Sequence, residues 1–123
     1  MEFDDISKRV IGCALEVHRF LGPGLLESAY EQCLAFELSS HNIKFKRQEP
    51  VPVIYKGIKL DCGYKIDLLV EDELIVELKS VSEINHLHEA QILTYMKLTQ
   101  KQTGLIINFN SQLLKNGIKR FVI

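Results

Sequence analysis

The sequence of 123 residues lacks a long hydrophobic run and has little net charge, with a formal value of −1. Its apolar stretches reach only about five residues, as from Val10 to Ala14, whereas a helix that crosses a bilayer needs about 20. The stretch from Met1 to Asp5 is acidic and has no basic region before an apolar segment, unlike a secretory signal. We therefore expect a protein without membrane spans that works in the cytoplasm.

Cysteine is also scarce, and its spacing does not suggest a metal knuckle. The cysteines, Cys13, Cys33 and Cys62, are odd in number and form no CxxC pair, which argues against a disulfide framework and a zinc knuckle. The sequence has no Ser/His/Asp or Cys/His order typical of covalent hydrolases, no phosphate-binding glycine loop and no HExxH segment. These absences exclude several common hydrolase schemes.

The composition is that of one ordinary globular domain, residues 1–123. Hydrophobic residues make up 46% and charged residues 25%, values close to globular averages. Basic residues are concentrated in two segments, 44–65 and 101–123. Either these segments line a groove for a polyanion such as nucleic acid, or they are ordinary solvated surface.

Hydrophobic periodicity predicts helices at both ends of a β-rich middle region. The first helix begins at Asp4 or Asp5, either of which can be its N-cap, and ends before Gly22-Pro23-Gly24. The third helix follows Asn85, its predicted N-cap. Its residues expected to face inward are Leu87, Ala90, Leu93 or Thr94, and Leu98. We expect this order to give a layered α/β or α+β domain. The predicted helices are 5–21, 25–39 and 86–100, and the predicted strands are 43–47, 51–55, 58–61, 64–70, 74–80, 105–109 and 118–123.

The most informative chemical pattern is a β-hairpin that brings two carboxylates together. If a three-residue turn pairs Val70 with Leu74, equal steps along both strands place Asp67 opposite Glu77. Strand alternation places Lys79 on the same face as Glu77. Two like charges that face each other destabilise a sheet unless something compensates them, and a bound cation would do so.

Two interpretations of this face stay open. In the first, Asp67, Glu77 and the backbone carbonyl of Leu78 bind Mg²⁺, or Mn²⁺ in its place, while Lys79 assists the attack of a metal-activated water on a phosphodiester. In the second, Lys65 pairs with Glu77 and Asp67 with Lys79 in exposed ion pairs worth about 0 to 1 kcal/mol each.

Two stretches of the chain resemble a known family. Asp67, followed by Glu77-Leu78-Lys79, resembles the D…ExK signature of the PD-(D/E)XK nuclease superfamily, although Ile66 stands where a proline often precedes the aspartate. The segment from Gly24 to Tyr30 resembles the defining motif of the GxxExxY protein family, a compact branch assigned to that superfamily. The resemblance covers nearly the whole chain, with further matches at Val51-Pro52, Tyr55-Lys56-Gly57, Gly63-Tyr64-Lys65, Asn108-Phe109 and Gly117-Ile118-Lys119-Arg120.

This resemblance implies a fold and an active site. The fold is the restriction-endonuclease-like αβββαβ core, a mixed central sheet flanked by helices, and the activity is Mg²⁺-dependent. Asp67 and Glu77 would hold the metal, Lys79 would be the catalytic lysine, and Glu27 would be an additional acid from the second helix. From local physics alone, Glu27 is equally a first-turn acid favoured by the helix dipole.

Further residues are assigned to substrate binding by the resemblance. Gln91 and Tyr95 resemble the QxxxY element of RecB-type nucleases, and helical spacing puts them on one face with His88. These side chains would flank the substrate phosphates, with Tyr30 from the second helix. Each has a structural alternative, since Tyr30 can belong to the core, Gln91 can tie a loop to the helix, and His88 can be a capping or packed imidazole.

The sequence as a whole therefore favours a metal-dependent nuclease that acts on nucleic acid, with DNA as the expected substrate. One alternative is a non-catalytic regulatory member of the same fold that binds nucleic acid or a protein. Another is a metal-free structural module in which the charges are simply paired. A homodimer is compatible with the small size, but the sequence contains no interface pattern.

Overall fold

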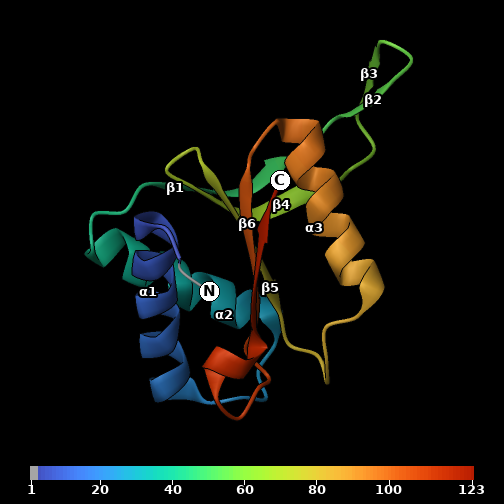
Figure 1. Cartoon of the computed structure of the whole chain (residues 1–123). Coiled ribbons are helices and arrows are strands. Elements are labelled where there is room, and N and C mark those ends of the chain that lie inside the picture. The colour runs from blue at the N-terminus through green and yellow to red at the C-terminus, as the bar shows by residue number, and fades with distance from the viewer. Residues whose placement is uncertain (1–2) are drawn as a thin grey trace.

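A five-stranded mixed sheet carries helices on both faces in the structure, a computed structural model that describes residues 3–123 (Figure 1). The sheet order is β1-β4-β5-β6-β7, in which β5 and β6 are parallel and the other neighbours antiparallel. This confirms the expected layered αβ fold with a mixed central sheet. The strands are β1 (Phe45–Pro50), β2 (Val53–Tyr55), β3 (Ile58–Leu60), β4 (Lys65–Val70), β5 (Leu74–Lys79), β6 (Thr103–Asn108) and β7 (Ile118–Val122), and the helices are α1 (Asp5–Leu21), α2 (Glu27–Ser40), α3 (His86–Thr99) and the short η1 (Leu114–Gly117).

The acidic N-terminal stretch, which differs from a secretory signal, runs from Met1 to Asp5. Its first two residues, Met1 and Glu2, lie outside the described residues. None of the described helices has the length and apolar character that a bilayer span requires.

Helices α1 and α2 form one layer because each turns an apolar stripe toward the same face of the sheet. Asp4, one of the two residues predicted to begin this helix, caps α1, since its carboxylate accepts the Ser7 N–H at 3.2 Å. Gly22 ends the helix in the left-handed region, with φ of 66°, a conformation that glycine adopts without steric cost. The chain therefore reverses after α1 and brings α2 alongside it.

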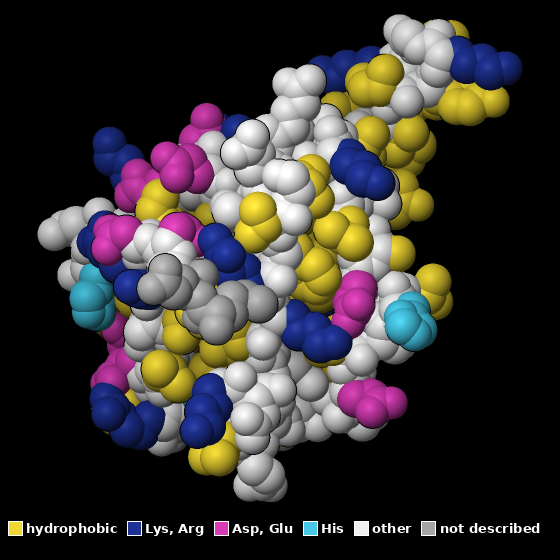
Figure 2. Space-filling view, in the orientation of Figure 1, with side chains coloured by type: hydrophobic (Ala, Val, Ile, Leu, Met, Phe, Trp, Pro, Cys, Tyr) yellow, Lys and Arg dark blue, Asp and Glu magenta, His cyan; other side chains and the backbone are white. Residues whose placement is uncertain are grey.

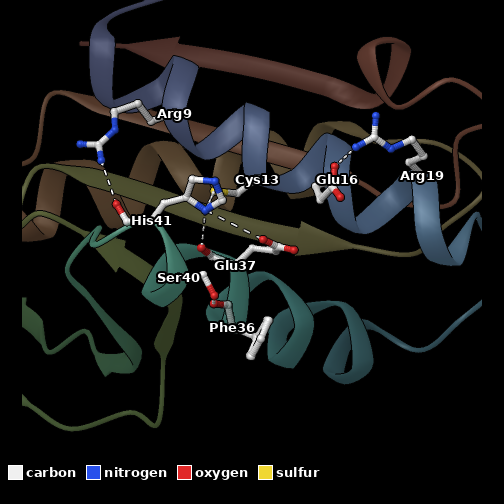
Figure 3. A network of polar contacts seen from close by, with 8 residues as sticks. All are labelled: Arg9, Cys13, Glu16, Arg19, Phe36, Glu37, Ser40 and His41. Carbon is white, nitrogen blue, oxygen red and sulfur yellow. Dashed lines mark hydrogen bonds and ion pairs between the residues drawn. The ribbon is translucent and has the colours of Figure 1, made fainter.

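A polar network at the end of α2 fastens the two helices to each other (Figure 3). Arg9 donates to the backbone oxygen of His41 at 3.1 Å, and the His41 ring contacts the Glu37 backbone oxygen at 2.9 Å and the Cys13 sulfur at 3.7 Å. Burial raises the pKa of the Cys13 thiol, so this cysteine stays protonated and unreactive at neutral pH. We interpret this network as structural.

Helix α3 covers the opposite face, where Ile92, Tyr95 and Met96 pack on the sheet. Gly104 of β6 permits this close approach, because a Cβ at that position would lie 3.0 Å from both Ile92 Cδ1 and Met96 Sδ. Asn85 is the N-cap, as predicted. The predicted inward face is only partly right. Leu93 and Leu98 pack against the sheet-side cluster, whereas Leu87 is 80% exposed, because the helix is rotated so that Ile92 and Met96 face the sheet.

The β4–β5 hairpin has the predicted register. Val70 pairs with Leu74 and Leu68 with Val76, so both strands step equally from the turn toward the candidate site. One detail differs from simple alternation, because Ile66 packs in the α3-side cluster rather than with Leu68 on the α1–α2 side. The regular ladder stops between these two residues, at Asp67, which explains the change of side.

Strands β2 and β3 form a separate two-stranded ribbon that projects from the body (Figure 1). We call residues 53–60 the arm. Ile54, Tyr55 and Ile58 are all more than half exposed on it. A two-stranded hairpin buries little surface by itself, so these apolar side chains add little to the core.

Candidate active site

Asp67 and Glu77 meet where the β4–β5 ladder ends. The Asp67 N–H donates to Glu77 Oε2 at 2.8 Å, and the Leu78 N–H donates to Asp67 Oδ2 at 2.9 Å. Each carboxylate therefore takes the place of a backbone acceptor on the facing strand. The expected convergence of the two acids is thus present, and it consists of reciprocal bonds between side chain and main chain.

The strand on the other side of Asp67 is also irregular. In β1, Arg47 pairs with Leu68 and Glu49 with Ile66, but the intervening Gln48 has a left-handed backbone with φ of 52° and no ladder partner among the described residues. Its side-chain amide instead donates to Asp67 Oδ1 at 3.3 Å. The sheet is locally open on both sides of Asp67, which gives its carboxylate room.

Glu77 is the acid of the site whose pKa is raised to a value above neutral pH. Its side chain is buried, with 4% exposure, and burial followed by repulsion from Asp67 raises its pKa to about 8. The pKa of Asp67 is also raised, mainly by burial, although the Leu78 N–H opposes the shift. Without a cation, the pair is expected to hold a proton at neutral pH.

Lys79 lies at the end of β5 and is half-buried. Its positive charge lowers the pKa of both Asp67 and Glu77, which places it within electrostatic reach of the pair. In the described part of the chain, neither Lys79 nor Lys65 forms an ion pair with these acids. The alternative of diagonal salt bridges is therefore not what the structure contains.

Glu27 reaches the same end of β5 from the first residue of α2. Its Oε2 accepts the Ser80 N–H at 3.4 Å, and the Ser80 hydroxyl donates to the Leu25 carbonyl at 2.6 Å. The loop of the GxxExxY-like segment is thereby fastened to the residue after Lys79. The negative charge of Glu27 adds to the upward shift of the Glu77 pKa, so this third acid lies near the pair.

Glu31 and its partners extend the site, and the sequence analysis missed them. Glu31 is buried on α2 and accepts hydrogen bonds from Gln48 Nε2 at 2.7 Å and from Arg47 Nε at 3.0 Å. Because Gln48 also reaches Asp67, the network joins α2 to the metal-site candidate. The available signal was the spacing of Glu27 and Glu31, which is four residues and puts both acids on one helical face.

The four residues predicted to bind substrate lie in different places. Tyr95 is close enough to the acids that their charges, after burial, help raise its pKa to about 12, and Gln91 lines a hollow beside it. His88 completes a capping box, because its Nδ1 accepts the Asn85 N–H at 3.1 Å. Tyr30 is fully buried, and its hydroxyl donates to the Gly22 carbonyl at 2.6 Å. The structure therefore places Tyr95 within electrostatic reach of the acids and Gln91 in the hollow beside Tyr95, whereas Tyr30 positions the loop before α2.

The donor set suits a hard divalent cation. Glu77 Oε1 accepts no hydrogen bond from the described residues, and Asp67 Oδ1 accepts only the long bond from Gln48, so each carboxylate keeps an oxygen available. Leu78 directs its N–H toward β4, and strand geometry turns its carbonyl to the same side. No cluster of three His, Cys, Asp or Glu side chains spaced for a metal occurs within residues 3–123, so other ligands would be carbonyl, water or phosphate oxygens.

A family model for the PD-(D/E)XK nuclease superfamily matches residues 4–121, nearly the whole chain. The protein therefore belongs to the PD-(D/E)XK nuclease superfamily, whose members generally hydrolyse phosphodiester bonds and usually use divalent metals such as Mg²⁺. Searches of curated proteins and of solved structures gave no match.

Proposed function

We propose that this protein is a Mg²⁺-dependent nuclease that cuts DNA, and that it belongs to the GxxExxY branch of the superfamily. The observation that carries the proposal is the reciprocal bonding of Asp67 and Glu77, which holds two carboxylates together at a break in the sheet while leaving an oxygen of each available. Burying two acids side by side is costly, and a bound cation offsets that cost.

Asp67, Glu77 and the Leu78 carbonyl are the residues that would hold the metal. When bound, a divalent cation would polarise the phosphate and lower the pKa of a coordinated water. The chain itself contributes a rigid frame: the Leu78 N–H orients Asp67, and the Asp67 N–H orients Glu77. Because each acid is oriented by main chain, the site does not depend on flexible side-chain partners.

We assign Lys79 a catalytic role, in contact with the substrate phosphate or the attacking water. It is half-buried, stays near both acids and has no ion-pair partner among the described residues, so its ammonium is available to a phosphate or to the attacking water. Tyr95 lies close by with a phenol that stays protonated below pH 12, which makes it a hydrogen-bond donor to substrate oxygens. Glu27 can accept a proton or a water hydrogen from the side of α2.

A cleavage assay tests the proposal. Labelled single-stranded, duplex and branched DNA and RNA are incubated with Mg²⁺ or Mn²⁺ and with wild type, Lys79→Ala or Lys8→Ala. We expect Lys79→Ala to lose about 10²- to 10³-fold in kcat, as when a charge-stabilising donor is removed. Lys8 is exposed on α1 and serves as the matched control, with unchanged activity.

The same assay can decide against hydrolysis. If no substrate is cut faster by wild type than by Lys79→Ala, the protein is not a nuclease under these conditions. Salt-sensitive binding without cleavage would then favour the non-catalytic, nucleic-acid-binding member of the fold.

A further inference from the structure

A hollow of about 570 Å³ lies between α3 and the base of the arm. Val53 and Tyr64 form one wall, and Leu87, Gln91, Thr94 and Tyr95 belong to the other. This volume falls in the range of sites that bind small organic groups. Tyr95 connects the hollow to the candidate active site, because it packs in the same buried cluster as Ile66, the residue before Asp67 in β4.

The outer part of the apolar wall of the hollow is not covered by the described residues 3–123. Helix α3 has two apolar stripes, and the sheet covers the one with Ile92 and Met96. Leu87 and Ala90, which periodicity predicted to be buried, are exposed and line the hollow, next to Leu98 at the edge of the sheet-side cluster. Leu87 is 80% exposed there. Exposed apolar surface that borders a candidate site is a feature of binding surfaces.

Aromatic and amide groups in the hollow suit a flat heterocycle. Tyr64 is 47% exposed, and its ring centroid lies 6.1 Å from that of Tyr95 at an interplanar angle of 59°, so the two rings are tilted and do not stack on each other. Gln91 offers both a donor and an acceptor for the edge of a base. An aromatic platform with a nearby amide is a common way to hold an unstacked nucleobase.

The charge around the hollow suits a polyanion. Lys56 and Lys59 are exposed on the arm, and Lys65 follows Tyr64. Figure 2 shows lysine and hydrophobic side chains next to each other on the projecting arm. The acids in the arm and its flanking residues, 49–65, are Glu49 and Asp61, and the Asp61 carboxylate already accepts the Gly63 N–H at 3.0 Å. Three lysines against two acids make this segment slightly basic, whereas Asp67 and Glu77 make the end of the hollow near Tyr95 acidic.

We propose that the hollow binds an unpaired nucleobase next to the scissile phosphate, so that the substrate is single-stranded or locally unpaired DNA. Paired bases in a duplex are stacked on their neighbours and cannot enter such a hollow without being extruded. The arm lysines then neutralise the backbone of the same strand. This inference rests on the proposed nuclease function for the position of the phosphate, but its binding test does not require cleavage.

Binding is measured by fluorescence anisotropy in EDTA, with a labelled single-stranded deoxyoligonucleotide and with the duplex of the same sequence. Wild type should bind the single strand more tightly. Tyr64→Ala should weaken single-strand binding about 5- to 150-fold, the effect of losing one stacked base, whereas Tyr64→Phe should keep it. Leu87→Ala should weaken binding in the same direction, and Leu113→Ala, an exposed leucine outside the hollow, should not.

Several outcomes would overturn the inference. Duplex binding as tight as single-strand binding, or unchanged single-strand binding in both Tyr64→Ala and Leu87→Ala, would do so. If Tyr64→Ala or Leu87→Ala instead shifts the protein to a smaller species in sedimentation, the hollow is a contact between copies of this chain. Leu87 is almost fully exposed, so its variant should keep the wild-type fold, which circular dichroism verifies.

The two proposals fail in different ways. Loss of all cleavage with retained, Tyr64-dependent single-strand binding would reject hydrolysis and keep the base site. Efficient cleavage of blunt duplex by wild type and Tyr64→Ala alike would keep hydrolysis and reject the base site.

Discussion

At the level of single residues, Glu77 combines a buried carboxyl group, a neighbouring acid and one hydrogen bond from the main chain. The bond from the Asp67 N–H favours the ionised form, but burial and repulsion outweigh it and the pKa rises to about 8. A buried acid that serves to bind a ligand is expected to lower the free energy of unfolding when the ligand is absent.

The pH dependence of stability follows from this pKa. Between the ordinary value of 4.5 and about 8, the folded protein holds a proton on Glu77 that the unfolded chain has lost, so the free energy of unfolding falls as pH rises through this window and then levels off. Glu77→Gln removes this titration and keeps an oxygen for the Asp67 N–H. We expect the variant to be more stable than wild type by about 1 to 3 kcal/mol at pH 8.5.

Urea unfolding of both proteins at pH 4.5, 6.5 and 8.5, without divalent metal, measures this difference. Groups remote from Glu77 titrate alike in the two proteins, so the difference between the proteins reports on Glu77 and its immediate neighbours. A gap that stays constant with pH would contradict the assignment of the raised pKa to Glu77.

At the level of elements, the contact between α3 and β6 decides which side of the helix faces the sheet. Gly104 leaves space for Ile92 and Met96, and any Cβ there would press on both. Because this contact sets the rotation of α3 about its axis, it also determines which residues of the helix line the hollow.

Substituting this glycine tests the contact. Gly104→Val should destabilise the fold by about 1 to 3 kcal/mol, because the added methyl groups overpack a buried interface. Thermal unfolding followed by circular dichroism measures the effect. Gly12 of α1 has open space around it, so Gly12→Ala is the matched control and should not destabilise. Equal melting temperatures for Gly104→Val and wild type would show that α3 does not pack this closely.

Some of these elements follow from the sequence and others cannot. The β4–β5 register was predictable because turn length and alternation leave one pairing that buries Leu68 and Val76. The face of α3 was not predictable, because the helix has two apolar stripes and periodicity alone does not choose between them. The choice depends on the close approach of α3 to Gly104 in β6, a tertiary contact that periodicity within the helix does not encode.

The site was predictable only for the residues that local spacing relates to one another. Asp67, Glu77 and Lys79 lie on two adjacent strands, so local spacing relates them. Gln48 and Glu31 reach the site across the sheet and from a helix, through a left-handed residue that strand propensity does not indicate. Contacts of this kind depend on tertiary structure.

At the level of the whole molecule, metal binding and folding should be coupled. A cation that binds the folded carboxylate pair and not the unfolded chain stabilises the fold by mass action, about 1.4 kcal/mol at tenfold over its Kd. For a domain of this size, the melting temperature should rise by about 4 to 8 °C. Below pH 8 the cation must first displace a proton from Glu77, so the rise at pH 6 should be smaller than at pH 8.

Differential scanning fluorimetry with MgCl₂ or MnCl₂ at pH 6 and pH 8 measures the coupling. Glu77→Gln should show little response to either salt, and NaCl of equal ionic strength controls for screening. A response as large in Glu77→Gln as in wild type would place the cation elsewhere on the molecule.

The reciprocal bonds between Asp67 and Glu77 have a consequence for how the site can change. Each acid supplies the acceptor that the other's strand lacks, so shortening either side chain leaves an unsatisfied donor on the opposite β segment. A replacement that shortens one of these side chains should therefore be tolerated only together with a change at the other position, whereas Glu77→Gln keeps the acceptor.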